Sequence, residues 1–181
     1  MTATQVLIVI AAVLGFWVVG AYNRLVRLRN GIGSAWTQLD EQLRRRASVL
    51  DALLTAVRPR MEGGDPHALD AADAAQRQVQ AAADAMRSRP VQEPGSASLV
   101  AAEGVLASAQ ARVAALLDEN PVLRADAQVH QALDELKAVD LRLQFARQGF
   151  NVAVDGYNDA ARQFPTTLVA WAFGLRRAGR V

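Results

Sequence analysis

Apolar positions recur along this chain at the spacing of one helical face. The first series follows an apolar N-terminal run, and its members are Leu25, Leu28, Ile32, Trp36, Leu39, Leu43, Ala47, Leu50, Leu54 and Val57. Its nine steps cover 32 residues, or about 3.6 residues per step, which is the period of an α-helix. Pro59 and the pair Gly63 and Gly64 come next, so we predict a helix over residues 24–58 that ends before them.

Two shorter helices are predicted after this one. Asp65 and Pro66 are typical of an N-cap and a first helical position, and they open a helix over residues 66–87. The segment SRPVQEPGSAS, residues 88–98, is rich in proline and small polar residues and predicts a connection. A third helix is then predicted over residues 99–117.

A fourth helix is predicted over residues 125–164, before Pro165. Its apolar series consists of Val129, Leu133, Leu136, Val139, Leu143, Ala146, Phe150, Val154, Tyr157, Ala161 and Phe164. Ten steps cover 35 residues, about 3.5 per step, which is the period of a coiled-coil seam. No segment alternates as a strand does. The sequence therefore predicts an all-α protein in which residues 24–164 form an antiparallel, coiled-coil-like four-helix bundle.

The N-terminal run has the composition of a membrane anchor. Residues 1–23 contain no ionisable side chain, and with its flanks the apolar core approaches the roughly 20 residues that a helix needs to cross a bilayer. A signal peptide normally begins with Lys or Arg, which this run lacks, although small residues ending at Ala21 leave cleavage as an alternative. Arginines follow immediately on one side only, which predicts a single-pass anchor with the N-terminus outside and the helices in the cytoplasm.

Composition and motifs give no sign of catalytic or metal chemistry. The sequence has no cysteine and only two histidines, His67 and His130, which lie far apart. Neither a zinc-protease motif, a phosphate-binding loop, a calcium loop nor a nucleophile elbow is present. The net charge of +2 is too small to indicate nucleic-acid binding. We therefore expect a protein that is not an enzyme and has no metal or cofactor.

Helix lengths predict that part of the bundle is left uncovered. At 1.5 Å per residue, the first helix beyond the anchor is about 55 Å long and the fourth about 60 Å, whereas the second and third are each about 30 Å. The first and fourth helices then pair alone near the membrane. Antiparallel pairing places Tyr22 near Phe164, Asn30 near Tyr157 and Asn158, Trp36 near Phe150 and Asn151, and residues 44–46 near Asp140.

This membrane-proximal stretch is the predicted site of self-association. Its candidate residues are Asn30, Gly31, Gly33, Trp36, Phe150, Asn151, Tyr157 and Asn158. The two glycines would let a second backbone approach closely, and a simple bend in the helix is the alternative.

Residues 165–181 form an apolar and basic C-terminal segment that we expect to lie on the membrane surface. It is too short to span a bilayer but has the aromatic and basic composition of an interfacial segment. The predicted membrane-surface residues are Tyr22, Arg24, Arg27, Arg29, Trp171, Phe173, Arg176, Arg177 and Arg180, whose six arginines would form a collar facing anionic lipids. The alternative is that Trp171 and Phe173 fold back and cap the bundle.

Two ordered sets of residues resemble the LemA family of bacterial membrane-anchored helical proteins. The N-terminal set is Tyr22, Asn23, Leu25, Val26, Leu28, Arg29, Asn30, Ala35, Trp36, Gln38, Leu39, Asp40, Gln42, Leu43, Arg44, Arg45 and Arg46. The C-terminal set is Phe145, Ala146, Arg147, Gln148, Phe150, Asn151, Tyr157, Asn158, Phe164, Pro165, Phe173 and Gly174. The chain departs from the family at Asp51 and Ala52, where Pro-Asn is usual, and at Gly149, where an aromatic residue is usual. The resemblance implies a four-helix soluble part on one anchor in the bacterial cytoplasmic membrane, and it implies no activity.

Three functions are compatible with these patterns. The first is a non-enzymatic scaffold that self-associates through its membrane-proximal stretch and contacts anionic lipids. The second is a monomeric membrane adaptor that recruits a partner such as a protease or a signalling protein. The third is a lipid- or small-molecule-binding bundle, for which the sequence lacks convergent buried polar residues at regular spacing.

Overall fold

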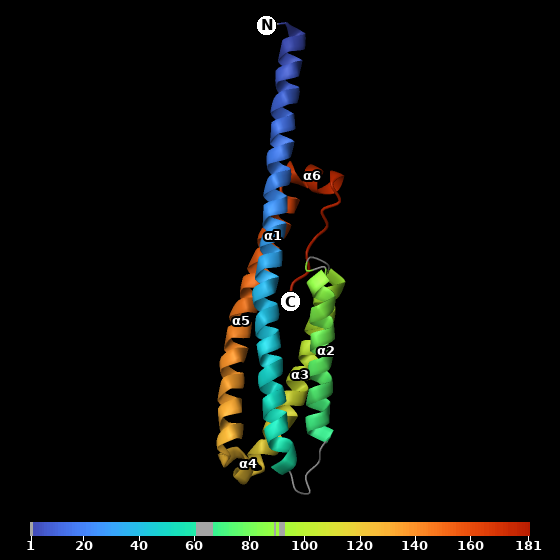
Figure 1. The fold of residues 1–181 in the computed structure, drawn as a ribbon. Helices are drawn as coiled ribbons and strands as arrows, with labels where there is room; N and C mark the ends of the chain where they lie inside the picture. The colour runs from blue at the N-terminus through green and yellow to red at the C-terminus, as the bar shows by residue number, and fades with distance from the viewer. Residues whose placement is uncertain (1, 61–66, 89, 91–92) are drawn as a thin grey trace.

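The computed structural model describes residues 2–60, 67–88, 90 and 93–181, and they form helices joined by turns (Figure 1). The elements are α1 (Ala3–Val57), the 3-10 turn η1 (Arg58–Arg60), α2 (His67–Ser88), α3 (Glu93–Asp118), α4 (Pro121–Ala125), α5 (Ala127–Arg162) and α6 (Thr166–Ala172). No strand occurs among these residues, so the all-α prediction is confirmed. The predicted N-cap at Asp65 and Pro66 lies outside the described residues.

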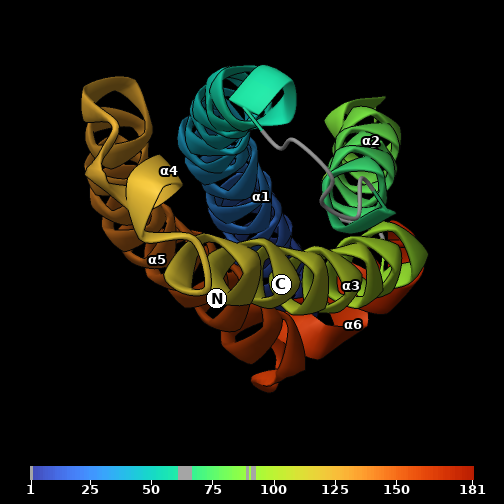
Figure 2. The same ribbon diagram turned by 90° about the horizontal axis from the view of Figure 1, so that it is seen from below.

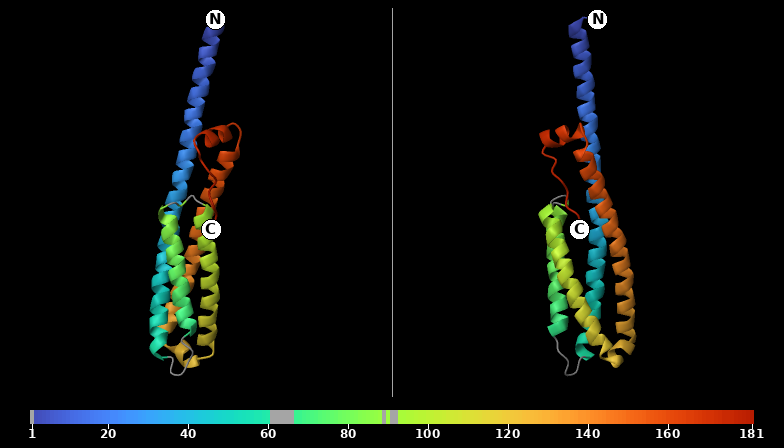
Figure 3. Two further views of the ribbon diagram at one scale, coloured as in Figure 1. Left: turned by 90° about the vertical axis from the view of Figure 1, so that its right-hand side faces the viewer. Right: turned by 180° about the vertical axis from the view of Figure 1, so that it is seen from behind.

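The longest element, α1, is one uninterrupted helix of 55 residues. Its N-terminal part, before Ala21, extends alone beyond the other helices, and its apolar side chains are exposed there (Figures 1 and 3). This part is long and apolar enough to cross a membrane, and none of its most apolar window is buried. α3 passes the same test of length and composition, but part of it is buried in the protein. The helix continues through Gly31 and Gly33 because the apolar stripe on either side of them is packed.

The second half of α1 pairs with α5, which runs in the opposite direction (Figure 1). The ring centroids of Trp36 and Phe150 lie 6.0 Å apart in an edge-on arrangement. Farther along the pair, away from the N-terminus of the chain, the Nη1 of Arg46 lies 4.0 Å from an Asp140 oxygen. Both contacts confirm the register that the helix lengths predict.

A second pair of antiparallel helices, α2 and α3, packs beside the half of α1 that is far from the N-terminus (Figures 1 and 3). Viewed from the distal end, α1 lies between α5 and α2, and α3 passes across them (Figure 2). The apolar faces of α2 and α3 join the same core as α1 and α5 through small and medium side chains, among them Ala72, Val79, Leu106 and Val113. The part of the α1–α5 pair that is closer in space to the chain's N-terminus, which includes the C-terminal end of α5, extends past α2 and α3.

Three helix boundaries differ by two residues or more from those that the sequence predicts. α3 begins at Glu93 rather than residue 99, because Pro94 sits in the first turn, where a missing N–H costs nothing. The fourth helix begins at Ala127 as α5 rather than at residue 125, because Asp126 caps it: its Oδ1 accepts from the Gln128 and Val129 N–H groups at 2.9 and 3.2 Å. The short helix α4, capped by Asn120, precedes it. α5 ends at Arg162, two residues before the predicted end.

A buried ionic cluster joins the α1–α5 pair to α3. Arg46 of α1 is only 5% exposed, and its Nη1 lies 3.1 Å from an oxygen of Glu103 on α3. Arg147 of α5 donates from Nη2 to the same carboxylate at 2.7 Å. Burial raises the pKa of Asp140 at the edge of this cluster, an effect that Arg46 opposes. Glu103 is therefore the anion that balances two cations, whereas Asp140 is charged at a cost.

Replacing Glu103 should destabilise the fold far more than replacing Asp140. Glu103→Gln leaves Arg46 buried without its main counter-ion, so the free energy of unfolding should fall by about 3 kcal/mol. Because the folded-state pKa of Asp140 is raised, ionising its carboxyl destabilises the fold, and this loss of stability is fully present above that pKa. Asp140→Asn should therefore leave stability at pH 7 unchanged or slightly higher. Denaturant unfolding of the detergent-solubilised protein, followed by circular dichroism, measures both. Equal losses in the two variants would contradict this assignment.

Candidate functional site

The C-terminal end of α5 and the short helix α6 lie beside α1 near Tyr22, where the exposed apolar part of α1 ends (Figures 1 and 3). α6 packs Thr166, Val169 and Ala170 inward. The ring of Phe173, just after α6, lies 4.8 Å from that of Tyr22 on α1. The expected neighbour of Tyr22 was Phe164, which instead is exposed at the turn before α6 because α5 ends early. α6 therefore covers the end of the α1–α5 pair.

α6 and the residues that flank it expose large apolar side chains at this level. Trp171 is 85% exposed and Phe164 81% exposed, and Leu168 and Phe173 are more than half exposed. Such a concentration of exposed aromatic and aliphatic groups is unusual on a soluble surface and is typical of a contact with lipid or protein. The capping alternative holds in part, since Phe173 contacts Tyr22 but Trp171 is exposed and the inner face of α6 makes the cap. Contact of the exposed side chains with the membrane stays a prediction.

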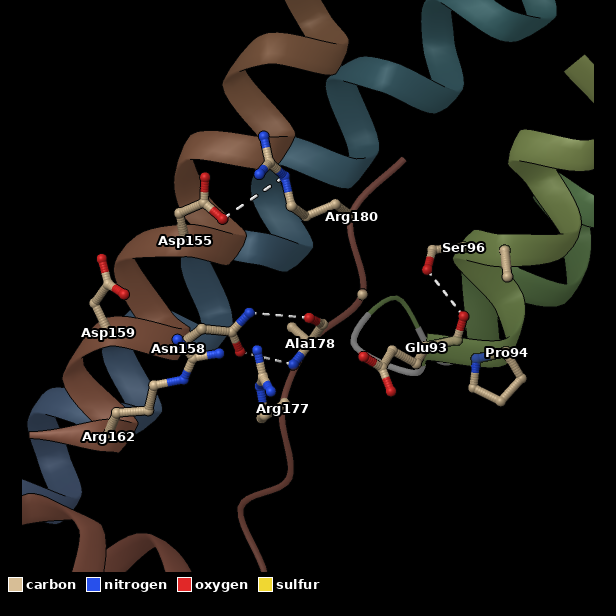
Figure 4. A pocket seen from close by; sticks show the side chains of 12 residues that line it. Glu93, Pro94, Ser96, Asp155, Asn158, Asp159, Arg162, Arg177, Ala178 and Arg180 are labelled. Atoms are coloured by element: carbon tan, nitrogen blue, oxygen red, sulfur yellow. Dashed lines mark hydrogen bonds and ion pairs between the residues drawn. The ribbon is translucent and has the colours of Figure 1, made fainter. Parts of the chain in front are cut away.

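After α6 the chain turns back along α5 as an extended segment, residues 174–181, which we call the tail (Figures 1 and 3). The turn is made at Gly174, whose φ of 64° is in the left-handed region that favours glycine. The tail passes between α5 and the first turn of α3 (Figure 4). It therefore bridges the two helix pairs at the point where α3 begins.

Two asparagine side chains of α5 hold the tail by its main chain. The amide of Asn158 donates to the Ala178 carbonyl at 3.0 Å and accepts from the Ala178 N–H at 2.9 Å (Figure 4). Asn151 repeats this arrangement with Val181, at 2.7 and 3.0 Å. The hydroxyl of Tyr157 donates to the carbonyl of Arg176 at 2.9 Å. All five bonds go to main-chain atoms.

The environment of Tyr157 keeps its hydroxyl a donor. Burial of the phenol raises the pKa of Tyr157, and the nearby charge of Arg29 only partly offsets this. The hydroxyl is therefore protonated at neutral pH, and its bond to the tail persists across the physiological range.

On its other side the tail fits closely against α3. A Cβ added to Gly179 would collide with the Ser96 hydroxyl and would lie 2.8 Å from the Cα of Glu93. Arg180, beyond this contact, lies 3.7 Å from an oxygen of Asp155 (Figure 4). A cavity of about 740 Å³ opens beside the tail, lined by acidic and basic side chains from α3, α5 and the tail itself. These contacts define the tail groove: Asn151, Asp155, Tyr157 and Asn158 on α5, and Glu93 and Ser96 on α3.

Three of the six arginines predicted at the membrane surface lie on α1 and three lie in the tail. Arg24, Arg27 and Arg29 are exposed on α1, and Arg176 and Arg177 are exposed in the tail. Arg180 lies beside Asp155 of α5 (Figure 4). The contact of these arginines with anionic lipids stays a prediction.

The predicted self-association residues also fall into two groups. Trp36, Phe150, Tyr157 and Asn158 are buried within the chain, in the α1–α5 seam or against the tail, and Asn151 is half-buried by the tail. They do not form an open surface, which corrects the predicted interface. Asn30 and Gly31 are exposed and Gly33 is half-buried. A Cβ added to either glycine would meet no other described residue within 4 Å, so this chain itself makes no close approach there.

An exposed apolar stripe on α5 is the feature that the sequence analysis missed. Leu141, Phe145 and Val152 are 55%, 66% and 64% exposed and lie on one face of the helix, with Gly149 and Gly156 beside them. Their spacing of four and seven residues is visible in the sequence, but the series through Val139, Leu143 and Phe150 is longer and conceals it.

Among the described residues, no group of three His, Asp or Glu side chains is placed to hold a metal ion.

Comparison with known proteins gives one family match. A model of the LemA family matches residues 35–180, which is most of the chain and includes the core helices, α6 and nearly all of the tail. No curated protein sequence matches this chain.

Weakening the Asn158 contact should release the tail. Asn158→Ala removes two hydrogen bonds of roughly 1 kcal/mol each, so the released fraction should rise about thirtyfold. Trypsin should cleave faster after Arg176 and Arg177 when the tail is released, and mass spectrometry of the C-terminal fragment measures the rate. Gln148→Ala, an exposed amide on the same helix, is the control. Equal cleavage of the two variants would mean that Asn158 does not hold the tail.

Proposed function

The chain belongs to the LemA family, and we propose that it is a non-enzymatic, membrane-anchored helical scaffold that self-associates through the exposed face of α5 in its α1–α5 pair. The observation that carries this proposal is the exposed apolar stripe of α5, formed by Leu141, Phe145 and Val152. In this proposal the four long helices act as one rigid antiparallel bundle. No catalytic group, metal or cofactor takes part.

The anchor in this proposal is the apolar N-terminal segment, residues 1–23, most of which belongs to α1. It lies in the bacterial cytoplasmic membrane with the N-terminus outside, since Arg24, Arg27 and Arg29 follow it on one side only. Because α1 is uninterrupted, the depth of the anchor also sets the height of the bundle above the bilayer. α6 then lies at the membrane surface, with Leu168 and Trp171 among the lipid headgroups and with the arginines of α1 near anionic lipids.

Self-association is supported by the position and composition of the α5 stripe. Phe145 and Val152 are two helical turns apart on the face directed away from the rest of the chain. Gly149 and Gly156 add no side chain to this face, so a helix of a second copy can approach closely. Burying two such side chains at an interface supplies several kcal/mol.

A monomeric adaptor is the second candidate. The same stripe would then bind a different protein, such as a membrane protease or a signalling protein, in a one-to-one complex. The two candidates differ in stoichiometry, since the scaffold purifies mainly with itself and the adaptor purifies mainly with one other chain.

Polar substitutions in the stripe should disperse the assembly without unfolding the protein. In the full-length protein in detergent, Phe145→Ser with Val152→Ser should raise the dissociation constant at least a hundredfold, because about 3–5 kcal/mol of apolar burial is lost. Light scattering after size exclusion measures the mass, and circular dichroism measures the melting temperature.

A buried residue supplies the matched comparison. Trp36→Ala should lower the free energy of unfolding by roughly 3–5 kcal/mol, because it leaves a cavity in the α1–α5 seam. The stripe variant should leave the melting temperature within a degree or two of the unchanged protein. An unchanged mass in the stripe variant would overturn this interface, and a monomeric unchanged protein would favour the adaptor.

α6 should be in contact with lipid in the membrane-bound protein. Because the chain contains no cysteine, single cysteines can report on depth. An environment-sensitive fluorophore on Leu168→Cys should be quenched strongly by lipids carrying a quencher near the headgroup. Val122→Cys, which is also exposed but lies at the distal end, should show almost no quenching. Equal quenching at the two positions would place α6 away from the bilayer.

A further inference from the structure

The tail groove holds an extended segment by its main chain and leaves no room for a side chain at Gly179. We propose that the groove is an exchangeable docking site whose occupant in the assembled protein is the tail of a second copy. This inference rests on the proposed self-association and assigns it a second connection, distinct from the α5 stripe.

The groove has the repeat of an extended peptide. Asn151 and Asn158 are seven residues apart, which is about 10.5 Å along α5. Their partners in the tail, Val181 and Ala178, are three residues apart, which spans roughly 10 Å in an extended chain. Each asparagine uses its carbonyl oxygen and its NH₂ group together on one residue of the tail. Two paired contacts in register make α5 a template for one extended strand.

The selectivity of the groove comes from its narrow side against α3. Ala178 and Gly179 are buried, and the first turn of α3 leaves no room for a side chain at Gly179. Asp155 then attracts a basic residue at the next position, which Arg180 fills. The fitted sequence is therefore a small pair, Ala-Gly, followed by arginine. A second copy of this chain carries this sequence, and it lies in the same membrane plane.

Exchange replaces every contact with an identical one. The five hydrogen bonds between α5 and the tail, and the Arg180 pair, form equally well with a neighbouring tail. Gly174 provides a hinge, because it leaves α6 in place on its own α1–α5 pair while the residues after it change direction. Exchange of an identical element is a low-cost route to assembly, and confinement of anchored copies to one plane raises their effective concentration.

Cross-linking between two differently substituted full-length chains tests this exchange. One chain carries Asp155→Cys and the other Arg180→Cys, and both are reconstituted together in a bilayer at high protein density. These positions face each other across the groove, and the sequence contains no other cysteine. A short thiol-specific cross-linker should join the two chains covalently. A pair that combines Asp155→Cys with Val122→Cys at the distal end should give at least tenfold less product.

Adding Gly179→Ala to the Arg180→Cys chain should reduce the product at least tenfold, because its tail no longer fits beside Glu93 and Ser96. A synthetic peptide with the sequence GLRRAGRV should compete for the groove of the original pair and lower the yield. The same peptide carrying Gly179→Ala should not compete. These peptide measurements remain informative if the substituted chain folds poorly.

The outcomes separate this inference from the proposed function. Exchange is overturned if the Asp155→Cys and Arg180→Cys chains give no cross-linked product while light scattering still finds a multimer. In that case self-association through α5 stands. If the protein is monomeric in the bilayer, the exchange and the scaffold both fail. Insensitivity of the cross-linked product to Gly179→Ala, in the chain and in the peptide, would also overturn the exchange.

Discussion

The length of the α1–α5 seam is the constraint on which the rest of the structure depends. Both helices extend well beyond α2 and α3, so the shorter pair covers the seam only in its distal part (Figure 3). The remainder carries apolar groups, including Leu25, Ile32 and Tyr157, which are fully buried nonetheless. α6 and the tail provide that cover. The reversal of the chain at Gly174 is therefore a structural requirement of the long seam and not a loose end.

Much of the architecture could be predicted because helix geometry is simple. A period near 3.6 residues identifies the helices, and a fixed rise per residue sets the register of Trp36 against Phe150 and of Arg46 against Asp140. The tail could not be predicted in this way. Asn151 and Asn158 bind main-chain atoms, so the sequence of the tail contains no complementary pattern that would reveal them. The start of α3 was missed for another reason, since Pro94 breaks a helix in its interior but is suited to its first turn.

The candidate interface shows a different limit of sequence patterns. An apolar series gives the face of a helix that is removed from water, but not whether the chain itself or another molecule removes it. Trp36 and Phe150 belong to the longer series and are buried by the chain, whereas Phe145 and Val152 form a shorter series and are exposed. Only the packing of α5 against α1 distinguishes the two faces. A residue of an assembly interface can therefore be recognised only after the buried series has been assigned. It is then one of the apolar residues that stay exposed on the helix.

The tail groove and the α5 stripe depend on different physical interactions, and this difference matters for the proposed assembly. The tail is held by hydrogen bonds, each worth only about 1 kcal/mol net because water competes for the same groups. The α5 stripe can gain free energy only by removing apolar surface from water, and that gain grows with the area covered. In the proposed scaffold, the stripe therefore supplies most of the affinity. The tail contributes little net energy when exchanged, but its paired amides and the close fit of Gly179 permit one register only. Affinity and geometry would thus be set by separate surfaces, on a bundle whose height above the bilayer is fixed by the continuity of α1.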